Sequence, residues 1–502
     1  MRRLPAIVIL LLASLVAAGQ DVASFEKRIT VKKLPNGLTV LVCERHEAPV
    51  FSFFTHVDAG SAQDPKGKGG LAHMFEHMAF KGTDKIGSTN YAAEKIALRK
   101  VEQAFAAYEA ERLKPVGQDK KKLAELKKTW QDAVEAADKY AELNKFSEIL
   151  ERNGVEDMNA FTSLDETGYF YSLPTNRLEL WAYMESERFL HPVLRQFYKE
   201  RDVVYEERRM RVDSSPIGRL VENFQAAAFV AHPYHNEGVG WPSEIEALSA
   251  TDASNFFSKY YVPANMVVTV VGDVTPQQVL PVVEKYFGRL PARPKPEPLD
   301  TVEPPQEAER ETILREASQP LFLEGYHRPD YRDPDDAVYD AISDLLSSGR
   351  TSRLYRALVR DKKIAVQAEG FSGFPGNKYP NLFAFFVVPS RGHTPQEIAK
   401  AVHEEIDKLI HQDVSDEELK MVKRRIRAEL IRSLADNEGL AQNLGTVQSR
   451  YGDWRELFRQ VDRVDKVSKA DIRRVAAKVF TAQNRTSAIT ETAAAAAQGG
   501  QQ

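Results

Sequence analysis

A proline-rich segment divides this chain of 502 residues into two parts that follow the same order of patterns. Residues 290–305 read LPARPKPEPLDTVEPP, a composition typical of an extended linker. Strand-like and helix-like runs lie on both sides of it, at 34–42, 50–61 and 260–274 before the linker and at 320–329, 335–349 and 381–389 after it. The shared order, which is one of pattern and not of residue identity, indicates an internal duplication. We therefore expect two αβ domains, at 25–290 and 311–488, with a linker at 291–310 and a disordered tail at 489–502.

Composition excludes several classes of protein. Apolar residues make up 43% of the chain and charged residues 28%, as in an ordinary soluble globular protein. The 68 basic and 72 acidic residues leave a net charge of −4, so nothing favours nucleic acid or a broad membrane surface as a partner.

The first residues resemble an export signal. Arg2 and Arg3 precede an apolar run from Ala6 to Ala18, which is shorter than the roughly 20 residues that a membrane-spanning helix needs. We expect residues 1–19 to be a signal peptide, a periplasmic or secreted location, and no membrane span after cleavage. The single cysteine, Cys43, allows no internal disulfide in the exported protein.

One segment interrupts the first domain. Residues 91–150 consist almost entirely of helix-forming residues, broken once at Lys114-Pro115-Val116-Gly117, which predicts a helical hairpin. Apolar residues recur along it at three- and four-residue steps, so that one face packs against something. The hairpin packs on itself in the simpler interpretation, and contacts a partner or the substrate in the other.

The motif that points to chemistry lies at 69–83, GGLAHMFEHMAFKGT. His73, Glu76 and His77 form an H-x-x-E-H pattern, and on a helix they fall within an arc of about 100°, opposite the apolar side chains. Two imidazoles at i and i+4 can bind one tetrahedral ion and leave Glu76 beside it to accept a proton. A single histidine in such a place is more often a hydrogen-bonded group near a core, but the complete pattern favours a metal site.

A catalytic zinc ion needs a third protein ligand. In FYKERDVVYEERRMR (197–211), Glu200 and Glu207 are seven residues apart and share a helical stripe with two valines, whereas Glu206 lies on a polar face. A carboxylate on an apolar stripe is costly unless it is paired or metal-bound. Spacing alone does not decide between Glu200 and Glu207, and the alternative is a solvated helix surface.

Three motifs in order resemble the pitrilysin and insulinase family, which includes the mitochondrial processing peptidase. They are HMFEH followed by AFKGT (73–83), NAFTSLDETGYFYSLP (159–174) and ERDVVYEE (200–207), and the resemblance extends from about Arg28 to Asn484. It implies an α+β fold of two homologous domains, each an antiparallel sheet covered by helices, with the helical hairpin inserted in the first.

The resemblance also implies the functional residues. One Zn²⁺ per chain would be bound by His73, His77 and Glu207, with Glu200 steadying a zinc-bound histidine. An extended peptide would add as a strand at the edge around Asn159 and Ala160. The implied activity is that of a zinc metalloendopeptidase acting on extended or unfolded chains, with Glu76 as the catalytic base. The alternatives are a non-catalytic scaffold subunit and a site-specific processing peptidase.

The chain departs from the family pattern in three places. The gap between His77 and Glu207 is longer than usual, and the hairpin accounts for the excess. Residues 155–158 stand where the family tends to have two glycines before Asn-Ala. Val359 and Val366 occupy positions where active single-chain relatives carry an arginine and a tyrosine that contact the substrate. The missing pair would come from a paralogous partner subunit or a second copy, unless Arg353, Tyr355 or Arg360 substitutes for it.

Overall fold

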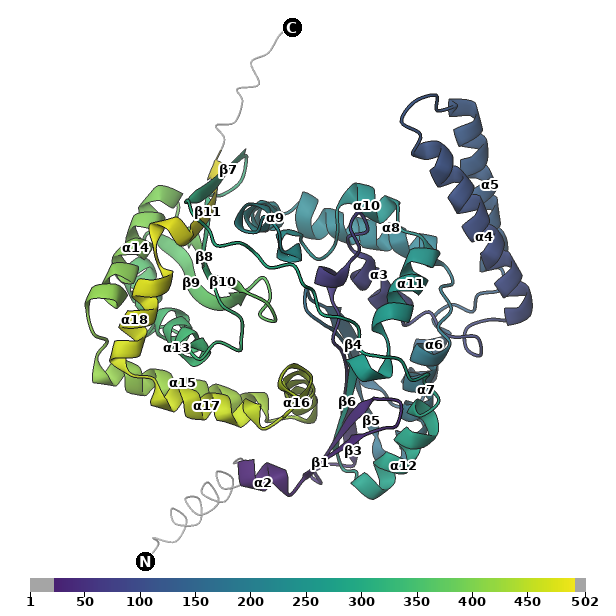
Figure 1. The fold of residues 1–502 in the computed structure, drawn as a ribbon, viewed down its shortest axis with the longest axis horizontal. Coiled ribbons are helices and arrows are strands. Elements are labelled where there is room, and N and C mark those ends of the chain that lie inside the picture. Colours follow the sequence, from purple (N-terminus) through teal and green to yellow (C-terminus); the bar gives the residue numbers. More distant parts are fainter. Residues whose placement is uncertain (1–21, 493–502) are drawn as a thin grey trace, which may run out of the picture. The chain divides into compact units, whose positions relative to one another are not determined.

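The computed structural model describes residues 22–492, so the expected signal peptide and residues 493–502 of the expected tail lie outside the described part. The chain forms two compact units, each assembled from three segments of the sequence (Figure 1). The first contains the described residues up to 206 together with 238–298 and 433–456, and the second contains 207–237, 299–432 and the described residues from 457. The division falls within the continuous helix α8 (Phe197–Arg208). Among the described helices, none has both the length and the apolar character needed to cross a membrane.

A six-stranded sheet in the order β1-β2-β6-β3-β5-β4 is the centre of the first unit. Its neighbours are antiparallel except for the parallel pair β2 and β6. The strands are β1 (Ile29–Lys33), β2 (Thr39–Glu44), β3 (Val50–Val57), β4 (Glu156–Thr162), β5 (Thr167–Pro174) and β6 (Met266–Gly272). The helices are α2 (Val22–Glu26), α3 (Leu71–Met78), α4 (Tyr91–Arg112), α5 (Lys120–Asp138), α6 (Lys145–Glu151), α7 (Leu178–Leu190), α8, α10 (Pro242–Glu246), α11 (Ala250–Tyr260), α12 (Pro276–Phe287) and α16 (Asn437–Tyr451).

Helices cover both faces of this sheet because side chains alternate along its strands. Phe51 and Phe53 of β3 point to one face, where they contact the ring of Trp181 from α7. Phe54 points to the other face, which is covered by α16. A side chain at Gly445 of α16 would begin only 2.8 Å from the Phe54 ring, so a glycine is needed for this close approach.

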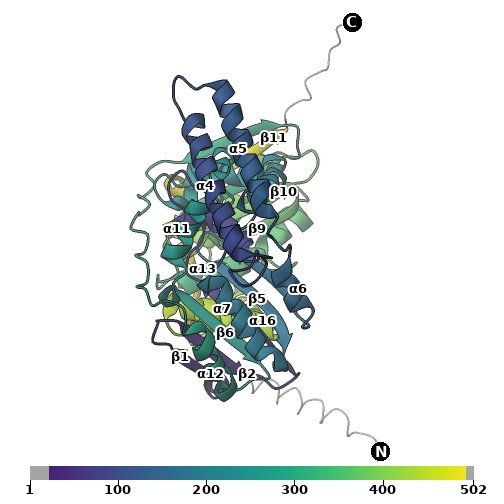
Figure 2. The same cartoon turned by 90° about the vertical axis from the view of Figure 1, so that its right-hand side faces the viewer.

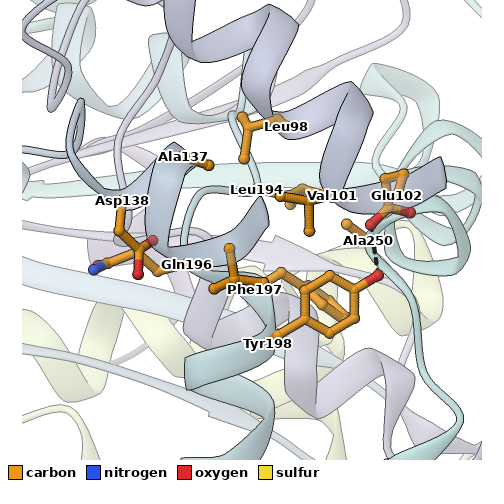
Figure 3. A pocket seen from close by; sticks show the side chains of 11 residues that line it. Leu98, Val101, Glu102, Ala137, Asp138, Leu194, Gln196, Phe197, Tyr198 and Ala250 are labelled. Carbon is orange, nitrogen blue, oxygen red and sulfur yellow. Dashed lines mark hydrogen bonds between the residues drawn. The ribbon is translucent and has the colours of Figure 1, made fainter. Parts of the chain in front are cut away.

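The inserted hairpin is formed by α4 and α5, which pack against each other. Trp130 of α5 stacks on Tyr108 of α4 and meets the ring of Tyr198 at the start of α8. A small pocket with mostly apolar walls is lined by side chains of α4, α5 and the start of α8, and the Tyr198 hydroxyl donates to Glu102, which also lines it (Figure 3). The expected single hairpin over 91–150 is thus shorter than predicted, because a second break at 139–144 makes α6 a separate helix.

The second unit is built on a five-stranded sheet in the order β7-β11-β8-β10-β9, with β7 and β11 parallel and the other neighbours antiparallel. Its strands are β7 (Arg310–Glu316), β8 (Leu321–Arg328), β9 (Ala365–Phe374), β10 (Asn381–Pro389) and β11 (Arg485–Thr492). Its helices are α9 (Pro216–Ala228), α13 (Asp336–Ser347), α14 (Pro395–His411), α15 (Asp416–Ser433), α17 (Glu456–Lys466) and α18 (Lys469–Val479), and two π-helical turns lie at Arg209–Asp213 and Tyr355–Asp361.

The two sheets have the same topology once β1 is set aside. In each, a parallel pair at one side (β2 and β6, or β7 and β11) is followed by three antiparallel strands. The α+β fold of two similar halves is therefore as the sequence predicted, with one parallel pair in each otherwise antiparallel sheet.

Each half of the chain also contributes one helix to the other unit. Helix α9, from the first half, packs on β7, β8 and β11, whereas α16, from the second half, packs on β3 and β6. Glycines permit both contacts: a side chain at Gly325 of β8 would begin 2.7 Å from the ring of Phe224 in α9. Nothing in the sequence patterns predicts this exchange.

Candidate metal centre

Helix α3 is fixed at its first turn. Gly70 precedes it with φ of +86°, and a Cβ at this position would lie 2.1 Å from the Val239 carbonyl oxygen. The Asp64 carboxylate accepts hydrogen bonds from the backbone N–H groups of Gly70 and Ala72, each at 2.8 Å. Because helix N-termini leave unpaired N–H groups, this carboxylate defines where α3 begins.

The two sides of α3 differ as the helical period requires. Met74, Phe75 and Met78 are completely buried, and the Phe75 ring packs against Tyr261 with centroids 4.5 Å apart. His77 lies on the opposite side and is partly exposed. The apolar side therefore holds the helix in place while the other side presents polar groups.

His73, His77 and Glu207 come together in space. One ligand atom from each lies within 4.8 Å of the others, and the two imidazole rings are perpendicular with centroids 4.8 Å apart. Within residues 22–492 this is the one group of three or more His, Cys, Asp or Glu side chains close enough to bind a metal ion. Two imidazoles and one carboxylate are a donor set that suits a catalytic zinc ion and leaves one tetrahedral position open. Glu207 also forms an ion pair with Arg211 at 2.7 Å.

Glu200 is not in this group of three but contacts one of its members, His77. Its Oε1 is 3.1 Å from Nδ1 of His77, and its Oε2 is 2.5 Å from the Lys81 ammonium. Burial raises the pKa of Glu200, but the hydrogen bonds from His77 and Lys81 outweigh it and hold this pKa below its ordinary value. An ionised Glu200 orients the His77 ring so that Nε2 is directed away from it. The structure thus groups Glu207, and not Glu200, with the two histidines.

Glu76 accepts a hydrogen bond from β4. The hydroxyl of Thr162, the last residue of that strand, donates to Oε2 of Glu76 at 2.7 Å. Thr162 stands within the NAFT motif, but its contact with α3 is not evident from the sequence, because it depends on how the strand and the helix cross.

Asn159 and Ala160 lie on β4, which is an edge strand of the six-stranded sheet. Its pairing with β5 shifts register between Glu156 and Asn159, and Asp157 has φ of +55°. This bulge stands where the family tends to have glycines, and Asp is one of the few residues that tolerates such a φ. Asn159 is exposed and its backbone edge is not covered by another strand of the sheet.

The chain belongs to peptidase family M16. The model described as "Insulinase (Peptidase family M16)" matches residues 39–110 and 133–240, and the model described as "Peptidase M16 inactive domain" matches residues 247–426. The segment between the two matched parts of the first model, 111–132, contains the end of α4, the connecting loop and the larger part of α5.

Named relatives agree with this assignment. The chain is 29% identical over 422 residues to the zinc protease PqqE of Helicobacter pylori, covering 81% of this chain and 80% of that protein. It is 23% identical over 470 residues to the probable mitochondrial-processing peptidase subunit beta of Arabidopsis thaliana, covering 90% and 76%. The crystal structure of a protease from Helicobacter pylori superposes with a TM-score of 0.76 at 26% identity, covering 92% of this chain and 99% of that one.

Proposed function

We propose that this chain is a zinc-dependent endopeptidase that hydrolyses peptide bonds in extended peptides or unfolded chains. The single observation that carries the proposal is the convergence of His73, His77 and Glu207 beside a carboxylate, Glu76, that is not one of the three grouped ligands. The zinc-protease names of its relatives support the same reaction class.

His73, His77 and Glu207 would bind one Zn²⁺, with Glu200 orienting His77. When bound, the ion supplies Lewis-acid chemistry that polarises the scissile carbonyl and makes a nearby water more acidic.

Glu76 is the proton carrier in this mechanism. Its carboxylate takes a proton from the attacking water and gives it to the leaving amine, as a general base and then a general acid. The hydrogen bond from Thr162 to Oε2 restricts rotation of the carboxylate.

The edge of β4 would bind the substrate backbone. A peptide added as a strand beside Asn159 and Ala160 would hydrogen-bond to main-chain groups, so that the enzyme would select for extended conformation more than for sequence. Because Thr162 is on the same strand, the peptide would be positioned by the element that also orients Glu76.

We further propose that the chain is the metal-bearing subunit of a two-subunit peptidase. The positions of the family's substrate-binding arginine and tyrosine hold Val359 and Val366, and the Val366 side chain is 64% exposed on β9. Neither valine side chain can form a hydrogen bond or a charge contact with a peptide, so a paralogous partner or a second copy would supply the arginine and the tyrosine.

The chain's location is also proposed to be exported, since Arg2, Arg3 and the apolar run after them match a signal peptide. N-terminal sequencing of the mature protein from the cell envelope or medium tests this, and an intact Met1 contradicts it.

The function is tested by purifying the chain with whatever co-elutes, measuring zinc, and assaying unstructured fluorogenic peptides with and without chelator. About one zinc per chain and chelator-sensitive cleavage are expected. A metal-free chain without cleavage activity would instead be a scaffold subunit. Cleavage of one precursor at one position, with short peptides left intact, would make it a specific processing enzyme. Full activity of the chain alone, after removal of the companion, would contradict the two-subunit arrangement.

A further inference from the structure

The distal end of the α4–α5 hairpin lies outside the residues that the family model matches. The family model matches residues 39–110 and 133–240 but not the segment between them. In both views of the molecule, this end projects away from the six-stranded sheet of its own unit (Figures 1 and 2). The metal-binding side chains lie on other elements, so the hairpin tip, residues 111–122, needs an explanation of its own.

The tip exposes apolar side chains. Leu113 is 64% exposed and Val116 is 84% exposed, the largest value among the large hydrophobic side chains of the described residues. Pro115 lies between them and is also exposed. Exposure of aliphatic side chains to water costs free energy, which is recovered when another surface covers them.

A hydrogen-bond network fixes the loop that carries these side chains. Glu111, only 2% exposed, accepts from the Lys114 ammonium at 2.7 Å and from the Asp119 backbone N–H at 3.0 Å. Asp119 in turn caps α5 at Lys121 N. Because hydrogen bonds hold both ends of the loop, binding through Leu113 and Val116 costs little backbone conformational entropy.

The tip is also basic. From Glu111 to Lys122 the sequence ERLKPVGQDKKK holds five basic residues and two acidic ones, although the whole chain has a net charge of −4. Lys120 and Lys121 are exposed next to the apolar residues. This combination of aliphatic and basic side chains on one small surface complements a layer that is negatively charged outside and apolar beneath.

We propose that the hairpin tip docks on an anionic lipid bilayer. Leu113 and Val116 enter the headgroup region, and Lys120 and Lys121 bind lipid phosphates. A protein partner fits less well, because a stable protein interface buries about 800 Å² on each side, and the convex end of a single hairpin offers few residues for it. A bilayer requires only a few inserted side chains and attracts each nearby lysine separately.

The test is vesicle flotation of the full mature chain with phosphatidylcholine vesicles that contain or lack 30% phosphatidylglycerol. Binding is expected only with the anionic lipid and is expected to weaken at high salt. Lys120→Glu/Lys121→Glu and Leu113→Ser/Val116→Ser should each lower the partition coefficient about tenfold or more. The matched control is Ile96→Ser on α4, which removes an aliphatic side chain that is 58% exposed outside the tip and should leave binding unchanged.

The proposal is overturned if the parent chain does not float, if it binds neutral vesicles equally well, or if the tip variants bind like the parent. If the tip variants still bind but Ile96→Ser does not, the membrane contact lies elsewhere on the hairpin. Circular dichroism verifies that each variant is folded. Peptide cleavage is measured separately, so a failure of the enzymatic assignment does not affect this result.

Discussion

The two units share one sheet topology but differ in the helix that follows the strand β3 or β8. In the first unit this helix is α3, which presents His73, Glu76 and His77. In the second it is α13, whose sequence DAVYDAISDLLS contains no histidine. Ser343 and Ser347 of α13 donate to the Gly370 carbonyl of β9, whereas the equivalent contact in the first unit links a threonine of β4 to a carboxylate.

The comparison of α3 with α13 distinguishes the side of the helix that stabilises the fold from the side that can carry chemical groups. Both helices bury an apolar side: Met74 and Phe75 in α3, and Ile342 and Leu346 in α13, are all fully buried. The opposite side does not contribute to the core and can change without loss of the fold. A few substitutions on that side would therefore suffice to distinguish the proposed catalytic unit from the other one.

The largest expected effect tests that distinction directly. Replacing Glu76 by Gln removes the general base and should lower kcat about a thousandfold or more, with zinc content unchanged. Ser343→Ala on α13 is the matched change in the other unit and should leave kcat within about twofold, since it removes only one neutral hydrogen bond. Steady-state kinetics on an unstructured peptide measures both, and substantial turnover by Glu76→Gln would remove the proposed role.

The next effect concerns Glu207, the proposed metal ligand that is furthest along the chain. Glu207→Gln should weaken zinc binding by about a hundredfold or more, measured by competition with a chromogenic chelator. Glu206→Gln, one residue earlier on the same helix and exposed, is the control and should retain the parent affinity. Equal affinities for the two variants would contradict the ligand assignment.

The exchanged helices allow the two units to be compared for stability. Gly445→Val in the first unit and Gly325→Val in the second should each destabilise the protein by about 1–3 kcal/mol, because both introduce side chains against a packed phenylalanine ring and a second packed side chain. Urea unfolding monitored by circular dichroism measures the loss. Thr446→Ala, beside Gly445, is the control. A neutral effect in one unit only would mean that its exchanged helix packs less tightly than the other.

The smallest effect is expected at Thr162. Thr162→Val keeps the shape of the side chain but removes its hydrogen bond to Glu76, so kcat should fall about five- to tenfold while KM changes little. Thr162→Ser restores a hydroxyl and should recover most of the rate. A purely structural role would instead alter protein stability and leave the Ser and Val variants equally active.

Local patterns in the sequence predicted the parts of this molecule that depend on local physics. The 3.6-residue period at 69–83 placed His73 and His77 on one side of a helix, and the repeated order of runs predicted two similar sheets. The choice between Glu200 and Glu207 could not be made from periodicity, because both share one stripe, and only tertiary packing brings Glu207 into one group with the two histidines and Glu200 to Nδ1 of His77. The Thr162 contact, the bulge at Asp157 and the exchange of α9 and α16 depend on tertiary packing, for which the sequence carries no period or spacing.

The exchange of helices gives the proline-rich connection an unexpected role. A protease that cut the chain near residue 298 would produce two fragments, yet each compact unit would still contain segments of both. The two fragments could separate only if α16 left the sheet of the first unit and α9 left the sheet of the second. The nicked protein should therefore migrate as a single particle under native conditions, and an isolated first half would expose the apolar sheet face around Phe54 and tend to aggregate.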